Sequence, residues 1–209
     1  IPLAYIRGKV EFYGREFVIS KHVLVPRPET EMMIDELKAA LQKGAPHTEC
    51  VIVDVGTGSG AIAVTAKLEF PKVHVIATDI DPKALKIARQ NAKKHDVNIE
   101  FTQGDLLAPL PAAKPPTVIL ANLPYVPDRY SINQAAEHEP KHAIFGGKDG
   151  LNLYRRFWEQ IARLCRKPFL VLTESLPMQH NGMLDLARQA NFELRSSQNF
   201  IQVFGPTVN

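Results

Sequence analysis

The sequence predicts an α/β fold built around a mainly parallel β-sheet, and three observations support this prediction. Short apolar runs alternate with stretches of helical periodicity from residue 51 to residue 190. A glycine-rich turn joins the first apolar run to the helix after it. Acidic residues stand at the places where the strands should end. Strands that alternate with helices form βαβ units, in which neighbouring strands run parallel.

The elements follow one another in a regular order. We expect strands at residues 51–55, 73–78, 99–102, 117–121 and 169–173, and closing strands at 192–195 and 200–204. We expect helices at about residues 61–70, 82–95, 151–165 and 178–190. Asp81 is a good N-cap for the second of these helices, and Pro82 suits its first position. Residues 122–150 lack periodicity, and long loops inside compact domains are commonly functional.

The beginning of the chain departs from this alternation. Residues 9–19 alternate with a period of about two around Gly14, which predicts a β-hairpin. A helix should then begin near Thr30, and Gly44 and Pro46 should end it. We therefore expect two parts. Residues 1–44 form a hairpin and a helix, and residues 45–209 form the α/β domain.

Composition excludes several classes of protein. The chain has 209 residues and a formal net charge of +3, from 25 Lys and Arg against 22 Asp and Glu. This balance argues against a strongly basic nucleic-acid binder. Two cysteines, Cys50 and Cys165, are too few for a disulfide framework or a Cys-rich zinc site, and they suit a reducing compartment. No apolar run reaches the length of a membrane span. We expect a cytoplasmic protein without a membrane segment or a metal.

The glycine cluster between Asp54 and Ala61 predicts a cofactor site. Glycines allow a sharp turn and a close approach of the backbone to a ligand, and the helix that follows presents free N–H groups. Asp79 and Asp105 follow the next two strands, so the same edge of the sheet should carry them. The spacing of Asp79 suits a carboxylate that binds ribose hydroxyls. The candidate cofactor-binding residues are Asp54, Gly56, Thr57, Gly58, Gly60, Asp79, Ile80, Asp105, Leu106 and Asn122.

A second cluster, Asn122-Leu-Pro-Tyr125, follows the fourth expected strand directly. Leu123 and Pro124 prevent a helix from continuing there, so backbone carbonyls stay available. The Asn122 amide and the carbonyl of residue 123 can accept N–H bonds, and Tyr125 offers a flat aromatic face. Together they suit a planar nitrogen group such as an amide NH2. The candidate catalytic residues are Asn122, Pro124 and Tyr125.

These motifs together resemble those of the class I S-adenosylmethionine-dependent methyltransferases. Within that class the chain is similar to the peptide chain release factor glutamine methyltransferases. The similarity rests on Pro2–Gly8, Glu11–Gly14, Val25–Glu31, Glu139-Pro140 and Phe145–Leu151, nearly from end to end. The Arg-Pro-Glu-Thr-Glu and Gly-Gly-x-Asp-Gly-Leu segments are far more specific than the glycine cluster.

The resemblance implies a Rossmann-like fold. Its sheet would have seven mainly parallel strands, helices on both faces and an antiparallel last strand, with a small β-hairpin in front. It implies S-adenosylmethionine as cofactor, S-adenosylhomocysteine as product, and the Gly-Gly-Gln glutamine of a release factor as acceptor. The resemblance, together with the role given above to the Asn122–Tyr125 segment, implies these candidate substrate-binding residues: Arg27, Pro28, Glu29, Thr30, Leu123 and Glu139. We expect a monomer whose partner is a release factor, with no stable nucleic-acid binding. No dedicated base is evident, so the amide proton should leave to water.

One position departs from the family pattern, because Leu123 stands where the family usually has Pro. Asn-Leu-Pro-Tyr is instead typical of ribosomal RNA adenine dimethyltransferases, so an RNA adenine N6-methyltransferase is one alternative. A nicotinamide-dependent (NAD) oxidoreductase is another, since Gly56-x-Gly58-x-x-Ala61 also fits the loose dinucleotide pattern. A cofactor-binding partner protein without catalysis is the third. The resembled family normally carries a further helical N-terminal domain, which we expect this chain, starting at Ile1, to lack.

Overall fold

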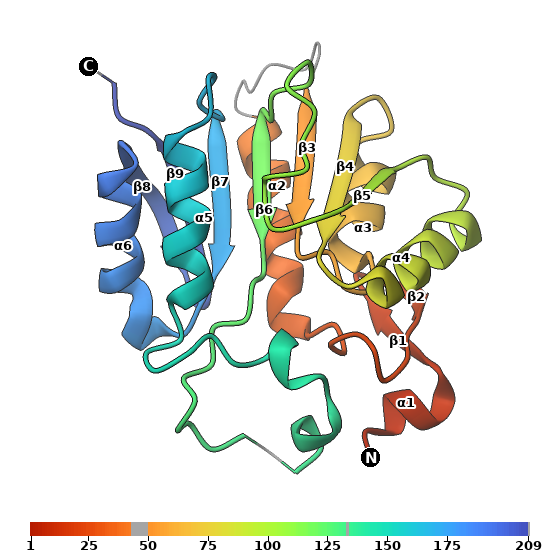
Figure 1. Cartoon of the computed structure of the whole chain (residues 1–209). Helices are drawn as coiled ribbons and strands as arrows, with labels where there is room; N and C mark the ends of the chain where they lie inside the picture. The colour runs from red at the N-terminus through yellow and green to blue at the C-terminus, as the bar shows by residue number, and fades with distance from the viewer. Residues whose placement is uncertain (43–49, 133, 209) are drawn as a thin grey trace.

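A seven-stranded β-sheet organises the molecule (Figure 1). The structure, a computed structural model, describes residues 1–42, 50–132 and 134–208. In this part of the chain the strand order is β5-β4-β3-β6-β7-β9-β8. The strands are β3 (Val51–Val55), β4 (His74–Asp79), β5 (Glu100–Gln103), β6 (Val118–Ala121), β7 (Leu170–Glu174), β8 (Phe192–Gln198) and β9 (Ile201–Pro206).

The strand directions confirm the predicted sheet. β3 pairs in parallel with β4 and β6, and β6 pairs in parallel with β7. The last strand, β9, lies antiparallel between β7 and β8, as expected. Every residue of β3, β6 and β7 is buried, because helices cover both faces of the sheet. This double burial explains why these strands appear in the sequence as continuous apolar runs.

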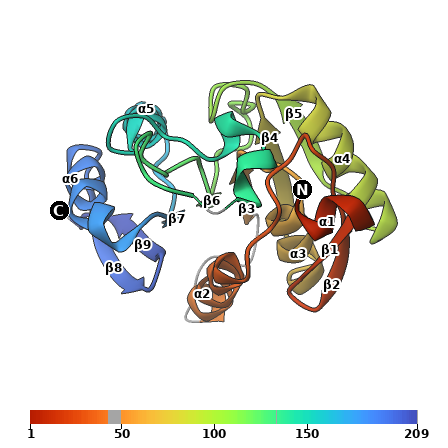
Figure 2. The same ribbon diagram turned by 90° about the horizontal axis from the view of Figure 1, so that it is seen from below.

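Helices lie on both faces of the sheet (Figure 2). α2 (Glu31–Gln42), α3 (Ala61–Glu69) and α4 (Pro82–Lys94) follow one another along one side, and α5 (Asn152–Ala162) packs with α6 (His180–Gln189) on the other. Successive residues of β3 face different cores: Ile52 packs with α2, whereas Val53 packs with the aromatic side chains of α5. No helix in the described ranges is both long and apolar enough to cross a membrane.

The N-terminal part contains the predicted hairpin, β1 (Lys9–Phe12) and β2 (Arg15–Val18). A five-residue helix, α1 (Leu3–Arg7), precedes it, and this helix is too short for periodicity to predict. Asn91 of α4 holds the hairpin, because its amide accepts from the main-chain N–H of Val18 and donates to the Val18 carbonyl. The predicted helix end at Gly44 and Pro46, and the boundary after residue 44, lie outside the described residues.

Several element ends differ from the sequence-based expectation. Two short 3-10 turns, η2 (Ala136–His138) and η3 (Lys141–Ala143), interrupt the segment expected to be a loop. The turns η1 (Pro28–Thr30) and η4 (Pro177–Gln179) precede α2 and α6, so both helices begin slightly later than expected. The closing strands extend beyond their predicted ends because they form a hairpin with each other.

The topology determines where a site can form. The parallel strands end at the lower edge of the sheet in Figure 1, where α1, the β1–β2 hairpin and residues 126–132 and 134–150 also gather. Ligands of open α/β sheets bind beyond the carboxyl ends of the strands.

Candidate active site

The turn after β3 depends on glycines with positive φ. Gly56 has φ 72° and Gly58 φ 55°, values that residues with a side chain rarely adopt. A Cβ atom on Gly56 would lie 3.0 Å from Leu123 Cδ2, whereas one on Gly58 would meet nothing nearer than the Gly56 carbonyl at 4.0 Å. The turn is therefore close to the Asn122–Tyr125 segment on one side and open to a ligand at Gly58.

Asp54 lies beneath this turn and shapes it. Its Oδ2 accepts hydrogen bonds from Thr57 Oγ1 at 2.6 Å and from the Ala63 N–H at 3.1 Å. Burial raises the pKa of Asp54 to about 7, although the Thr57 hydrogen bond acts in the opposite direction. Asp54 thus supports the turn from beneath. It is 1% exposed and does not line the cleft described below.

Asp79 connects the end of β4 to the glycine turn. Its Oδ2 accepts from the Gly58 N–H and its Oδ1 from the Asp81 N–H, both at 2.9 Å. Burial raises the pKa of Asp79, and its two main-chain hydrogen bonds lower it. Each carboxylate oxygen has a further lone pair to offer to a ligand. The next residue, Ile80, is 64% exposed beside it, which is unusual for a large apolar side chain.

A cleft lies over these residues, with a volume of about 1080 Å³ counted to its open mouth. We call it the first cleft. It brings together eight of the ten predicted cofactor-binding residues: Gly56, Thr57, Gly58, Asp79, Ile80, Asp105, Leu106 and Asn122. The other two, Asp54 and Gly60, do not line it. A Cβ atom on Gly60 would lie 3.0 Å from Ala88 Cβ, so this glycine allows α3 to approach α4 closely.

The far side of the first cleft contains an ion pair that the sequence did not reveal. Arg156 of α5 forms a short ion pair with Asp105, and Gln160 is a weaker neighbour at 3.5 Å. The carboxylate of Asp105 is therefore engaged by α5, and Leu106, whose φ is 52°, also lines the cleft. His142 of η3 also lines this cleft.

A second pocket, with a volume of about 780 Å³, adjoins the first cleft. Both cavities share Arg27, Asn122, Leu123 and Pro124 in their linings. Beyond this shared edge, the second pocket is lined by Tyr125, Tyr130 and Glu174. The segment that the sequence assigned to the acceptor group therefore lies between the two cavities.

The side chain of Asn122 is oriented by Thr30. Its Nδ2 donates to Thr30 Oγ1 at 3.0 Å, which uses a donor of the amide and leaves the acceptor Oδ1 for another group. The main-chain N–H of Leu123 donates to the Tyr154 hydroxyl at 3.3 Å. The Leu123 side chain itself is buried, 3% exposed, against the glycine turn.

Glu174 is a functional candidate that sequence reasoning missed. It is the last residue of β7 and is 1% exposed, and its Oε1 accepts from the Tyr125 hydroxyl at 3.0 Å. Burial raises the pKa of Glu174 to about 7, with Thr30 and Tyr125 acting in the opposite direction. Burial also raises the pKa of Tyr125. The available signal was the position of Glu174 directly after the strand expected at residues 169–173, at the edge that also carries Asp79 and Asn122.

The predicted substrate-binding residues occupy different positions. Arg27 lines both cavities and forms an ion pair with the buried Glu139 at 2.6 Å. Glu139 also accepts a hydrogen bond from the Val25 N–H at 3.0 Å, so it holds the segment before η1 in place. It lines neither cavity. Pro28 and Glu29 are exposed and line neither cavity.

Comparison with known proteins agrees with this arrangement. Residues 46–144 match a family described as a methyltransferase domain. The release factor glutamine methyltransferase of Bacillus subtilis is 40% identical over 195 residues, which is 91% of this chain and 68% of that protein. The enzyme of the same name from Bacillus anthracis is 37% identical over 194 residues, 91% of this chain and 69% of that protein.

Solved structures share the fold at low sequence identity. A methyltransferase from Pyrococcus furiosus has a TM-score of 0.67 and 17% identity, covering 94% of this chain and 91% of its own. A magnesium protoporphyrin IX methyltransferase from Synechocystis, solved with bound SAM, has a TM-score of 0.56 and 14% identity, covering 84% of this chain and 79% of its own. The fold and the identities above lead to one conclusion: this chain belongs to the release factor glutamine methyltransferase family.

Proposed function

We propose that this protein transfers a methyl group from S-adenosylmethionine to the side-chain amide nitrogen of a glutamine in a peptide chain release factor. The acceptor we propose is the glutamine of the Gly-Gly-Gln motif. The observation that carries the proposal is the meeting of two cavities at Asn122, Leu123 and Pro124. Methyl transfer requires the cofactor and the acceptor to lie next to each other. The two adjoining cavities provide one place for the cofactor and one for the acceptor.

The residues of the first cleft fit the cofactor. A Cβ atom on Gly58 would project into open space, so the backbone leaves room for a ligand there. We assign the ribose hydroxyls to Asp79 and the adenine to the apolar side chains of Ile80 and Leu106. Both line the cleft, and Ile80 is exposed. S-adenosylmethionine supplies a methyl group activated by a sulfonium sulfur. The chain therefore has no need to activate the methyl group itself.

The residues of the second pocket would bind and orient the acceptor amide. Asn122 Oδ1 and the main-chain carbonyl of Leu123 accept N–H bonds from the amide, because the Asn122 nitrogen is already engaged by Thr30. Tyr125 packs on the amide plane, and its hydroxyl bond to Glu174 fixes the ring. Orientation of this kind contributes roughly 7–11 kcal/mol to lowering a barrier. That magnitude matters for an amide, whose nitrogen lone pair is delocalised and weakly nucleophilic.

We propose that residues 1–44 form an attachment to the domain of residues 45–209. This part of the chain contributes Arg27 and Thr30 to the lining of the first cleft. We also propose that the protein acts as a monomer, and its near-balanced charge of +3 supports the absence of stable nucleic-acid binding. The compartment we propose is the cytoplasm, and the free thiols Cys50 and Cys165 suit its reducing environment.

The test is methyl transfer from labelled S-adenosylmethionine, with a release factor and ribosomal RNA as parallel acceptors. We expect label in the release factor and, by mass spectrometry, a gain of one methyl group on the Gly-Gly-Gln glutamine. Label in ribosomal RNA alone would instead support the adenine N6-methyltransferase. Absence of label from both acceptors would overturn the proposed function.

A further inference from the structure

We infer that Glu174 contacts the acceptor amide in the second pocket and takes the proton that its nitrogen loses on methylation. The inference rests on the proposed function and adds a catalytic residue to it. It differs from the expectation that the proton leaves directly to water.

The two carboxylate oxygens of Glu174 have different surroundings. Oε1 accepts from the Tyr125 hydroxyl at 3.0 Å. Oε2 is buried and makes no hydrogen bond of good geometry with the described residues, although the Thr30 hydroxyl and the Asn122 amide lie close enough to lower the pKa of Glu174. An unsatisfied buried acceptor costs about 1–3 kcal/mol, so a well-placed donor at Oε2 would stabilise the site. Because Glu174 lines the second pocket, an amide N–H of the substrate would satisfy Oε2.

The carboxylate of Glu174 is held in place from two sides. The main-chain carbonyl of Glu174 accepts from the Tyr154 hydroxyl at 2.6 Å, and Tyr154 is fully buried in α5. The Tyr125 hydroxyl fixes the side chain from the opposite segment. Glu174 therefore holds its carboxylate at a rigid strand end, where it contacts the Tyr125 hydroxyl and is influenced by the Asn122 amide, the two groups assigned to the substrate amide.

The charged and titratable neighbours set its proton affinity. Burial is the main cause that raises the pKa of Glu174 to about 7, and Glu29 of η1 raises it further. The Thr30 hydroxyl, the Tyr125 hydroxyl and the Asn122 amide lower it. Tyr154 packs against it as a neutral phenol, and Arg27 lines another side of the pocket. A carboxylate with such an affinity accepts and releases a proton near neutral pH.

The step balances in atoms and electrons. The amide nitrogen forms the new N–C bond with its lone pair, while the methyl–sulfur bond breaks and its electron pair stays on sulfur. The nitrogen then carries two hydrogens, the methyl group and a positive charge. Oε2 takes one of these protons, which leaves a neutral N-methylamide and a carboxylic acid at Glu174. The acid releases its proton to water when the product departs.

The test compares Glu174→Gln with the wild type in full pH profiles of kcat. The Gln side chain has nearly the same shape and still accepts from Tyr125, but it takes no proton. We expect kcat to fall at least about a hundredfold, within the range for loss of a general base, with KM for the release factor changed little. We also expect the rise of kcat with pH around neutrality to disappear. Glu159→Gln, an exposed carboxyl of α5, should behave as wild type.

Two further variants separate proton transfer from structural support. Tyr125→Phe removes the hydroxyl but keeps the carboxylate, so it should lower kcat and retain the rise with pH. Glu174→Asp keeps a carboxylate and should also retain that rise, even with a lower rate. The inference is wrong if the wild type methylates the release factor and Glu174→Gln retains both kcat and the pH rise. A wild type that methylates no release factor would instead overturn the proposed function.

Discussion

The side-chain amide of Gln179 donates to the main-chain carbonyl of Tyr125 at 2.7 Å. The same nitrogen donates to the Asp149 carbonyl at 2.7 Å, and the Gln179 oxygen accepts from the Leu176 N–H at 2.9 Å. One buried side chain thus joins the proposed catalytic segment to the glycine-rich loop at residues 146–150. The position of the Tyr125 ring depends on a contact between parts of the chain that lie 54 residues apart.

Gly150→Ala should break this junction. A Cβ atom at Gly150 would lie 2.0 Å from the Tyr125 carbonyl oxygen and 2.2 Å from Gln179 Nε2, and the φ of Gly150 is 80°. We expect the positive φ to cost about 1–2 kcal/mol and the overpacking about 1–3 kcal/mol more. Methyl transfer should fall at least about a hundredfold, because small displacements of orienting groups have such effects. Urea unfolding and a transfer assay measure the two effects.

Gly14→Ala is the matched control for this substitution. Gly14 also has positive φ, 67°, but an added Cβ would meet nothing within 4 Å. It should therefore show the conformational cost alone and keep its activity. Equal losses of stability in the two variants would show that the Tyr125–Gln179 junction tolerates a side chain.

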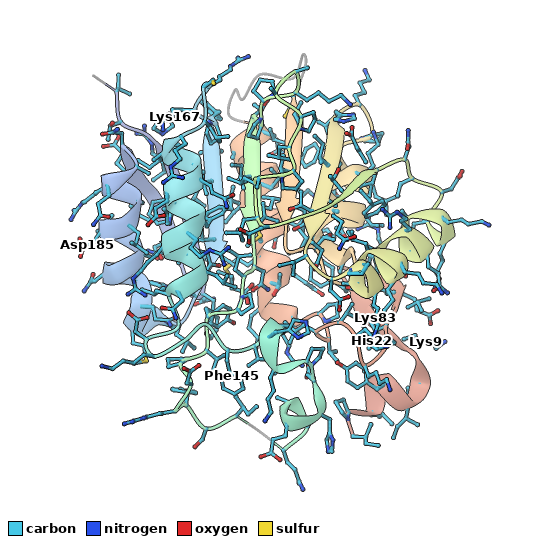
Figure 3. All side chains as sticks on the ribbon, in the orientation of Figure 1. Lys9, His22, Lys83, Phe145, Lys167 and Asp185 are labelled. Atoms are coloured by element: carbon cyan, nitrogen blue, oxygen red, sulfur yellow. The ribbon has the colours of Figure 1, made fainter. Side chains whose placement is uncertain are left out.

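Asp79→Asn should weaken cofactor binding. The substitution keeps one acceptor oxygen for the Gly58 N–H, loses the acceptor for the Asp81 N–H, and removes the negative charge that we assign to the ribose hydroxyls. Hydrogen bonds to charged groups are worth about 1.5–3 kcal/mol, so calorimetry should find affinity for S-adenosylmethionine at least about tenfold lower. Asp185→Asn is the control, since Asp185 projects from α6 at the far edge of the molecule (Figure 3). Unchanged affinity in Asp79→Asn would remove the ribose assignment.

Asn122→Ala should separate binding from transfer. Asn122 lies at the shared edge of the two cavities, and its assigned partner is the acceptor amide. We expect calorimetry to find cofactor affinity close to wild type, while kcat falls about a hundredfold because the amide loses a positioning partner. Asn98 is exposed, so Asn98→Ala provides a control for the removal of a side-chain amide. Transfer at the wild-type rate would mean that Asn122 does not hold the acceptor.

The sequence predicted the parts of the site that follow from strand position. β3 and β6 were recognisable because burial on both faces makes them continuously apolar. Since their carboxyl ends share one edge of the sheet, the location of Gly56, Asp79 and Asn122 followed from topology alone. All three residues line the first cleft, which confirms their predicted common location.

The missed residue Glu174, and the pairings that the sequence did not reveal, depend on contacts between distant segments. Glu174 meets Tyr125 across 49 residues of sequence, and Arg27 meets Glu139 across 112. Arg156 reaches Asp105 from a helix whose exposed face carries several other charged residues. Local propensity and periodicity contain no information about such pairs, so only a folded arrangement identifies them.

Leu123→Pro tests the departure from the family pattern. Proline keeps the main-chain carbonyl assigned to the acceptor amide, so we expect kcat/KM within about threefold of wild type, a difference under 1 kcal/mol. It removes the N–H that donates to Tyr154 and the side chain that packs on Gly56. The free energy of unfolding should therefore fall by about 1–3 kcal/mol. Leu123→Ala keeps the N–H and isolates the loss of packing.

The contrary result for this position is also informative. If Leu123→Pro unfolds like the wild type but loses transfer to the release factor, the leucine side chain itself contributes to the choice of acceptor. A parallel assay with ribosomal RNA then shows whether the specificity has moved.

Asp54→Asn should remove a pH dependence of stability. Burial raises the pKa of Asp54 to about 7 from an ordinary value of 3.8, so the folded protein holds this proton more tightly than the unfolded chain does. Its contribution to stability is therefore complete below pH 3.8 and is lost as the pH rises through about 7. A difference of one pKa unit corresponds to about 1.4 kcal/mol, so the loss across this window is at most about 4 kcal/mol.

Asparagine has no proton to lose in this range, and its oxygen can still accept from Thr57 and Ala63. In urea titrations at several pH values, the wild type should lose stability between about pH 4 and pH 7 more steeply than Asp54→Asn. Glu174, whose pKa burial also raises to about 7, contributes a second slope of the same sign in both proteins. The double variant with Glu174→Gln should therefore be flatter than either single variant. Parallel pH profiles for the wild type and Asp54→Asn would mean that Asp54 is already ionised beneath the glycine turn at the lowest pH examined.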